Sequence, residues 1–156
     1  AALTGHLVLA TLHTNDAASA PMRLIDMGVE PFLVSSTLIG SMAQRLVRRN
    51  CPKCKAPFQP EATSLARAFR REPGEVLYKG TGCPHCRNTG FRGRSGLYEM
   101  LVMCDEIADQ VMRRAPSNEI VAVARRHGLR LLREDGWAKV RQGLTTPDEV
   151  VMCTAL

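Results

Sequence analysis

The stretch CPKC at residues 51–54 and its repeat CPHC at residues 83–86 contain four of the chain's six cysteines. Each pair has the C-x2-C spacing that lets two thiolates reach one ion through a tight turn, and 28 residues separate the two pairs. Four thiolates form the closed tetrahedral set that structural zinc takes. We therefore predict that one structural Zn²⁺ is bound by Cys51, Cys54, Cys83 and Cys86.

Disulfide and redox roles are the alternatives for these cysteines. No basic-then-apolar leader is present, so we do not expect a secreted disulfide framework, and a redox C-x-x-C would not be duplicated. His85 lies inside the second pair and is an alternative ligand to one cysteine. Cys104 and Cys153 are isolated, and we interpret them as small core residues rather than ligands.

The segment around the cysteine pairs is the basic part of the chain. Residues 51–94 contain nine Lys and Arg against three Asp and Glu, whereas the flanking parts are close to balance. Arg87, Arg92 and Arg94 with Phe91 could form a nucleic-acid patch, so a stand-alone zinc-binding interaction or nucleic-acid module is an alternative function. Aromatic residues make up only 4% of the chain, which favours a solvated basic face instead.

Upstream of the cysteines, His6 and His13 flank the apolar run LVLATL at residues 7–12. Gly5 and a polar stretch bracket the run, which predicts a buried strand that leads into a helix. A strand rises about 3.3 Å per residue and alternates its faces, so the two rings would lie roughly 23 Å apart on opposite sides. We therefore expect each histidine to have a separate role, with no metal ion shared between them.

Two helices are expected between this run and the first cysteine pair. The first begins at Asn15 or Asp16 and continues to about residue 27, and Pro21 inside it predicts a kink or a late start. The second covers about residues 31–49, because its apolar residues recur mostly at three- and four-residue steps.

Regular hydrophobic patterns return after the second cysteine pair. Residues 97–102 are expected to form a strand. Helices are predicted at residues 61–71, 105–113, 117–127 with Ser117 as cap, 131–142 and, from Thr146, a short last one.

Length and composition limit the class of protein. The chain has 156 residues with 45% hydrophobic and 23% charged, which suits one globular domain or two small ones. No apolar run approaches the roughly 20 residues that a membrane-spanning helix needs. Because the sequence begins with Ala directly before a predicted internal strand, we expect a fragment of a longer protein.

Several stretches together resemble the C-terminal part of the type II secretion and type IV pilus assembly ATPases. The resemblance covers nearly the whole chain and keeps the motifs in order. It is carried by TGHLVLATLHTNDA (4–17), RLIDMGVEPFLVSSTLIGSMAQRLVRR (23–49), the paired C-x-x-C motifs, GFRGRSGLYEMLV (90–102) and GLRLLREDGWAKVRQGLTTPDEV (128–150). Pro21 departs from the family pattern, where an ordinary helix former is usual.

The resemblance implies an α/β fold built from the C-terminal portion of a RecA-like nucleotide-binding domain. Residues 1–50 would be the truncated end of that domain, and residues 51–96 an inserted zinc module found in the assembly branches of the family. Residues 97–156 would form a strand followed by a helical C-terminal subdomain.

For the full-length parent, the resemblance implies a homo-hexameric motor that hydrolyses ATP with Mg²⁺. The motor would be cytoplasmic and peripheral to the inner membrane, where a platform protein of a secretion or pilus system is its partner. His13 would reach toward the terminal phosphate of the nucleotide and partner the catalytic acid, and His6 would be a second member of the same histidine motif. Arg45 is either a solvated residue or a contact to phosphates or a neighbouring subunit.

The phosphate-binding motif itself does not occur in this sequence. G-x-x-x-x-G-K-[ST] is missing, and no Gly-Lys pair occurs anywhere. The acidic Mg²⁺ motif and the catalytic glutamate that the family places upstream are also missing. We therefore predict that these 156 residues alone do not hydrolyse ATP, whereas the parent does.

Overall fold

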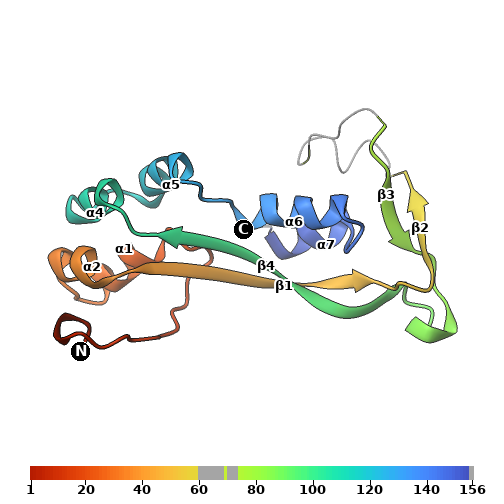
Figure 1. Ribbon diagram of the computed structural model, residues 1–156, viewed down its shortest axis with the longest axis horizontal. Coiled ribbons are helices and arrows are strands. Elements are labelled where there is room, and N and C mark those ends of the chain that lie inside the picture. The colour runs from red at the N-terminus through yellow and green to blue at the C-terminus, as the bar shows by residue number, and fades with distance from the viewer. Residues whose placement is uncertain (60–68, 70–73, 155–156) are drawn as a thin grey trace. The chain divides into compact units, whose positions relative to one another are not determined.

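The computed structural model describes residues 1–59, 69 and 74–154 (Figure 1). The chain divides into two compact units, Ala1–Ala43 with Glu99–Leu131, and Gln44–Tyr98 with Leu132–Leu156. Helices and strands are mixed, which agrees with an α/β fold. The division at residues 50 and 96 expected from the sequence stays a prediction.

Two long strands, β1 (Gly40–Asn50) and β4 (Phe91–Val102), pair with each other in a two-stranded sheet. The main chains come close where β1 begins, since the Met103 amide donates to the Ile39 carbonyl at 2.9 Å. A Cβ added at Gly40 would lie 2.6 Å from the Leu101 carbonyl oxygen. Glycine at this position therefore permits the close approach of the two strands.

The first unit packs four helices in sequence. They are α1 (Ala20–Asp26), α2 (Pro31–Thr37), α4 (Asp105–Met112) and α5 (Ser117–Arg126), preceded by the 3-10 turn η1 (Ala2–Thr4). Helix α1 contacts α2, α2 contacts α4, and α4 contacts α5. Val34, Ile107, Val111 and Ile120 are almost fully buried, so aliphatic side chains fill this core.

The first predicted helix takes the late start that Pro21 allowed. Helix α1 begins at Ala20 and places Pro21 in its first turn, where the missing amide hydrogen is not needed. The Asp16 carboxylate accepts a 2.7 Å hydrogen bond from the Ser19 amide just before the helix. Gly28 follows with φ of 94°, a conformation that glycine adopts readily.

The second predicted helix is wrong beyond residue 37. Helix α2 ends at Thr37, Leu38 is extended with ψ of 119°, and residues 40–50 form strand β1. Ala43 and Val47 are buried while Met42 and Leu46 are exposed, which is the period of two that a strand gives. The apolar spacing fitted both structures, and pairing with β4, which lies far along the sequence, selects the strand.

The predicted buried strand at residues 7–12 is also wrong for this chain. These residues have no regular secondary structure, and the side chains of Leu7 and Leu9 are 75% and 89% exposed. A strand depends on hydrogen bonds to a neighbouring strand. Among the described residues, the two sheets are β1 with β4 and β2 with β3, and neither includes this run.

The second unit joins a small hairpin-like sheet to two helices. Strand β2 (Lys55–Phe58) pairs antiparallel with β3 (Leu77–Gly80), with Lys55 opposite Gly80 and Phe58 opposite Leu77. Helix α6 (Leu132–Arg141) contacts β3 and α7 (Pro147–Thr154), and η2 (Pro84–Cys86) precedes β4. The tight contact between α6 and α7 needs Gly136, because an added Cβ would lie 2.4 Å from Val150.

The predicted strand at residues 97–102 is the second half of β4, which begins six residues earlier at Phe91. The four predicted C-terminal helices are confirmed with small boundary shifts. Ser117 is not the cap that the sequence suggested, because the helix begins at Ser117 itself and Pro116 occupies the cap position. The helix expected at residues 61–71 lies outside the described residues, apart from Phe69. Within the described ranges, no helix has the length and apolar character that crossing a membrane requires.

A buried carboxylate fixes α7 to β1 within the second unit. The Glu149 side chain is 8% exposed and accepts hydrogen bonds from the Arg48 amide at 3.0 Å and from Arg48 Nη2 at 2.5 Å. The Arg48 guanidinium holds the pKa of Glu149 below its usual range, although burial opposes this. Thr145 Oγ1 also donates to the Arg48 carbonyl at 2.8 Å.

Replacement of Glu149 by Gln should lower the free energy of unfolding by roughly 1–3 kcal/mol, because a charge-assisted pair to Arg48 is lost. Urea unfolding at pH 7 measures this difference, with exposed Glu119→Gln on α5 as the matched control. The pKa of Glu149 is lower in the folded chain than in the unfolded chain, where it is about 4.3. The ionised side chain therefore makes its full contribution to the free energy of unfolding above about pH 4.3, and this contribution is lost as the pH falls through the folded pKa. The difference in free energy of unfolding between wild type and Glu149→Gln should therefore become smaller in acid. Equal free energies of unfolding at pH 7 would contradict a stabilising role of the Glu149–Arg48 pair.

Candidate metal centre and histidine sites

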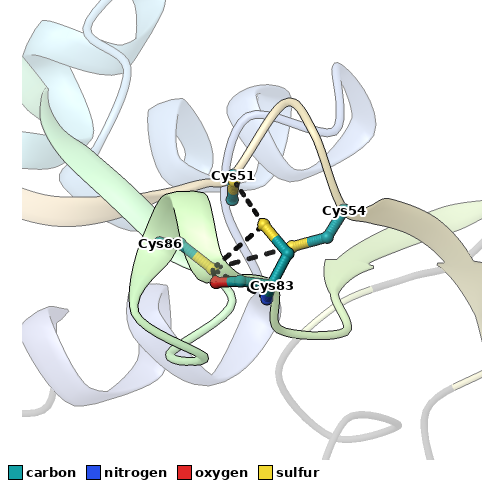
Figure 2. A group of neighbouring side chains, drawn as sticks. All are labelled: Cys51, Cys54, Cys83 and Cys86. Atoms are coloured by element: carbon teal, nitrogen blue, oxygen red, sulfur yellow. Dashed lines mark hydrogen bonds between the residues drawn. The ribbon is translucent and has the colours of Figure 1, made fainter.

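The four predicted zinc ligands converge on one point in the second unit. Cys51 directly follows β1 and Cys54 directly precedes β2, whereas Cys83 directly precedes the η2 turn and Cys86 is the last residue of that turn. Figure 2 shows the four side chains directed toward a common centre from two separate segments. Their Sγ atoms all lie within 4.8 Å of one another, and all four cysteines are free thiols.

The sulfur spacing fits a tetrahedral zinc ion. The Sγ–Sγ distances are 3.9 Å for Cys51–Cys83, 3.8 Å for Cys54–Cys86 and 3.7 Å for Cys83–Cys86. Four sulfurs at the usual Zn–S distance of about 2.3 Å from a tetrahedral ion are about 3.8 Å apart. These four cysteines can therefore hold Zn²⁺ as a closed structural site without an open position for chemistry.

Backbone amides stabilise one of the sulfurs as a thiolate. The amides of Cys83 and Gly90 both donate to Cys86 Sγ at 3.3 Å. Burial alone would raise the pKa of Cys86, but these two amides and the neighbouring thiols lower it to about 6. Burial raises the pKa of Cys54 to about 11, against a weaker effect of the Gly82 amide, so a bound cation is needed to deprotonate this thiol near neutral pH.

Local backbone geometry brings the two pairs together. The Cys51 amide donates to the Gly90 carbonyl at 2.9 Å, and the Thr81 amide donates to the Cys54 carbonyl at 3.0 Å. Gly80 and Gly90 are in direct main-chain contact, because a Cβ on Gly80 would lie 1.9 Å from the Gly90 oxygen. The module thus depends on main-chain contacts that no side chain could replace.

The other candidate ligands lie outside this cluster. Within the described residues, the metal-ligating group contains only the four cysteines, so His85 is not part of it. The pKa of His85 is lowered by burial and by the cations Arg92 and Lys53. Cys104 and Cys153 are half-buried at the ends of helices, and Cys153 Sγ donates to the Leu46 carbonyl at 3.3 Å.

The two histidines line separate hollows of the first unit. His13 is exposed and lines a hollow of about 550 Å³ with mostly polar neighbours, among them Asp16 and Arg23. His6 lines another of about 480 Å³, and its Nδ1 lies 3.1 Å from Thr4 Oγ1. Their assigned roles toward a nucleotide stay predictions. Arg45 lies in β1 and its Nη1 donates weakly to the Gln44 carbonyl at 3.4 Å.

Sequence reasoning missed one buried acid that bonds the backbone four residues after His13. Glu99 is only 3% exposed and accepts a hydrogen bond from the Ala17 amide at 2.9 Å. A signal for it was present, because Glu99 lies two residues from both Leu97 and Leu101. In the predicted strand all three side chains share one face, so a carboxylate is placed on the buried face.

Comparison with known proteins identifies relatives over nearly the whole chain. Residues 1–152 match the family described as Type II/IV secretion system protein. The chain is 51% identical to the Type IV pilus assembly ATPase PilB of Thermus thermophilus, covering 99% of this chain and 18% of that protein. It is 46% identical to the Type II secretion system ATPase E of Vibrio cholerae, covering 99% of this chain and 31% of that protein. The chain therefore spans less than a third of the length of these relatives.

Replacement of Cys83 by Ser should abolish the binding of about one zinc ion per chain, because three remaining thiolates leave the tetrahedral set incomplete. Atomic absorption of the dialysed protein measures the metal content. The matched control is Cys104→Ser, which lies outside the cluster and should keep its zinc.

The same change has a structural consequence that is measured independently. Amide hydrogen exchange should accelerate at residues 51–58 and 77–90, since zinc affinity in small modules is worth roughly 10–16 kcal/mol of folding free energy. A chelator added to the wild-type chain should give the same pattern. Retained zinc in Cys83→Ser would exclude the four-cysteine site.

Proposed function

Because this chain belongs to the type II/IV secretion system protein family, we propose that it is the C-terminal segment of a motor ATPase for type II secretion or type IV pilus assembly. The observation that carries this proposal is the family match over residues 1–152, with relatives named as ATPases of both systems. A stand-alone zinc-binding or nucleic-acid module does not account for the match outside residues 51–96.

The proposal extends to a RecA-like nucleotide-binding domain in a longer parent protein. The apolar run at residues 7–12 is exposed in this chain, and the relatives are more than three times as long. An exposed run of this kind is stabilised by burial, which supports its role as an inner strand of the larger domain. We propose that the parent forms a cytoplasmic homo-hexamer at the inner membrane and acts on a membrane platform protein there.

The zinc module has a structural role in this proposal. Its four thiolates fill the coordination sphere of the ion, so no position is open for a substrate or for water. Asn50, next to Cys51, donates through Nδ2 to the carbonyls of Tyr78, Gly143 and Thr145. The zinc module and the loop between α6 and α7 would therefore move as one piece when the motor changes conformation.

His13 is the residue of this chain that we propose to act on the nucleotide. Its ring is exposed at the edge of a polar hollow, so it is accessible to a phosphate group brought by the rest of the parent. There it would donate a hydrogen bond to the terminal phosphate, where charge develops during hydrolysis. His6 would support the same segment, while ATP and Mg²⁺ would be held mainly by residues outside this sequence.

Replacement of His13 by Ala in the full-length parent should lower kcat for ATP hydrolysis by about 10²-fold, which is the usual loss when one donor to a transition-state charge is removed. KM for ATP should change much less, because the donor acts mainly in the transition state. Steady-state phosphate release measures both constants.

Two controls belong to this experiment. His127→Ala changes an exposed histidine at the C-terminal end of α5, which bonds Glu106 on α4. This variant should leave ATP turnover unchanged. The 156-residue chain with Mg²⁺ and ATP should release no phosphate, because it lacks the phosphate-binding loop. A wild-type kcat in His13→Ala would overturn the role given to His13. Phosphate release by the 156-residue chain alone would overturn the proposal that ATP and Mg²⁺ are held mainly by residues outside this sequence.

A further inference from the structure

One backbone position just after His13 is held from both sides by side chains that are remote in sequence. Glu99 on β4 accepts a 2.9 Å hydrogen bond from the amide of Ala17, 82 residues away. Ser41 on β1 donates a 2.7 Å hydrogen bond to the carbonyl of Ala17, 24 residues away. Both peptide groups of Ala17 are therefore fixed to the paired strands; we call this arrangement the Ala17 clamp.

The Glu99 bond of the clamp is buried, and the Ser41 bond is half-buried. Ala17 and Ala18 are 1% and 0% exposed, and Glu99 is 3% exposed. Loss of the carboxylate removes the acceptor that the structure gives to this buried amide, which is costly. A carboxylate also makes a stronger bond to an amide than a neutral acceptor does.

The chain between His13 and the clamp is short. Only three residues separate His13 from Ala17, and the Asp16 carboxylate continues the turn by accepting from the Ser19 amide. Residues 6–14 have no regular secondary structure that could hold the imidazole in place. The clamp therefore attaches the chain to the paired strands within four residues of His13.

We propose that Glu99 and Ser41 are positioning residues for His13. They act through the backbone of Ala17, and neither is required to touch the nucleotide. The proposal rests on the function proposed for His13, and it adds that the paired strands set the position of its ring. A displacement of about 1 Å at a catalytic group is enough to cost roughly 10²-fold in rate.

The test is a double-mutant cycle in the full-length parent, with ATP turnover measured for wild type, Glu99→Ala, His13→Ala and the double variant. Glu99→Ala should lower kcat about tenfold or more while KM for ATP changes less than about threefold. In the His13→Ala background, Glu99→Ala should lower kcat almost no further, because that variant has no imidazole whose position could change. Glu99→Gln keeps an acceptor and should restore most of the lost kcat.

A second measurement detects the clamp without activity. In the 156-residue chain, amide exchange at Ala17 should accelerate at least tenfold in Glu99→Ala, with α2 and α4 unchanged. Ser41→Ala keeps a partner for the Ala17 carbonyl, since the Ala20 amide also donates to it, so this variant should fold and give a smaller acceleration over residues 14–19. Exposed Ser36→Ala on α2 and Glu119→Gln on α5 are the matched controls.

The outcomes separate the two proposals. Unchanged exchange in both variants, or an equal loss of kcat from Glu99→Ala with and without His13, would overturn the positioning role. Full activity in His13→Ala would instead overturn the proposed function, whereas faster exchange at Ala17 would still demonstrate the clamp.

Discussion

The pairing of β1 with β4 is the constraint on which the other features depend. The two strands come from distant parts of the sequence, and each contributes residues to both compact units. Cys51 directly follows the end of β1, and Cys86 lies five residues before β4 begins. The same strands carry Ser41 and Glu99, which bond the backbone beyond His13. Within the second unit these strands lead to the metal site, and within the first unit they bond the backbone beyond His13.

Features set by local sequence were predicted well. Each C-x2-C pair closes its own turn, so its spacing identified the ligands, whereas main-chain contacts bring the two pairs together. The C-terminal helices form where the apolar spacing is regular, and Pro147 lies at the start of α7. The predictions failed where pairing with residues distant in the sequence determines the secondary structure. Residues 40–50 have an apolar spacing that suits a helix, yet the hydrogen bonds to β4 make them a strand. Residues 7–12 have the composition of a buried strand, but the described chain offers them no partner.

The candidate sites differ in how much of them this chain contains. The thiol cluster is complete within the second unit, with its sulfur spacing and amide donors already set by the fold. The His13 segment lines part of a polar hollow in the first unit. The proposed function gives a reason for this contrast, because a structural metal module can be self-contained while a nucleotide site of the kind proposed for the parent draws on several segments.

The contact between Gly80 and Gly90 has a consequence for protein engineering. Each glycine occupies the space that a side chain on the other would need, so neither position can be changed alone even though neither carries a functional group. A designer who transplants the four cysteines to another scaffold would copy every ligand and still omit the main-chain contact between the two pairs. The smallest unit that can be transplanted therefore includes Gly80 and Gly90, which have no side chains, as well as the four cysteines.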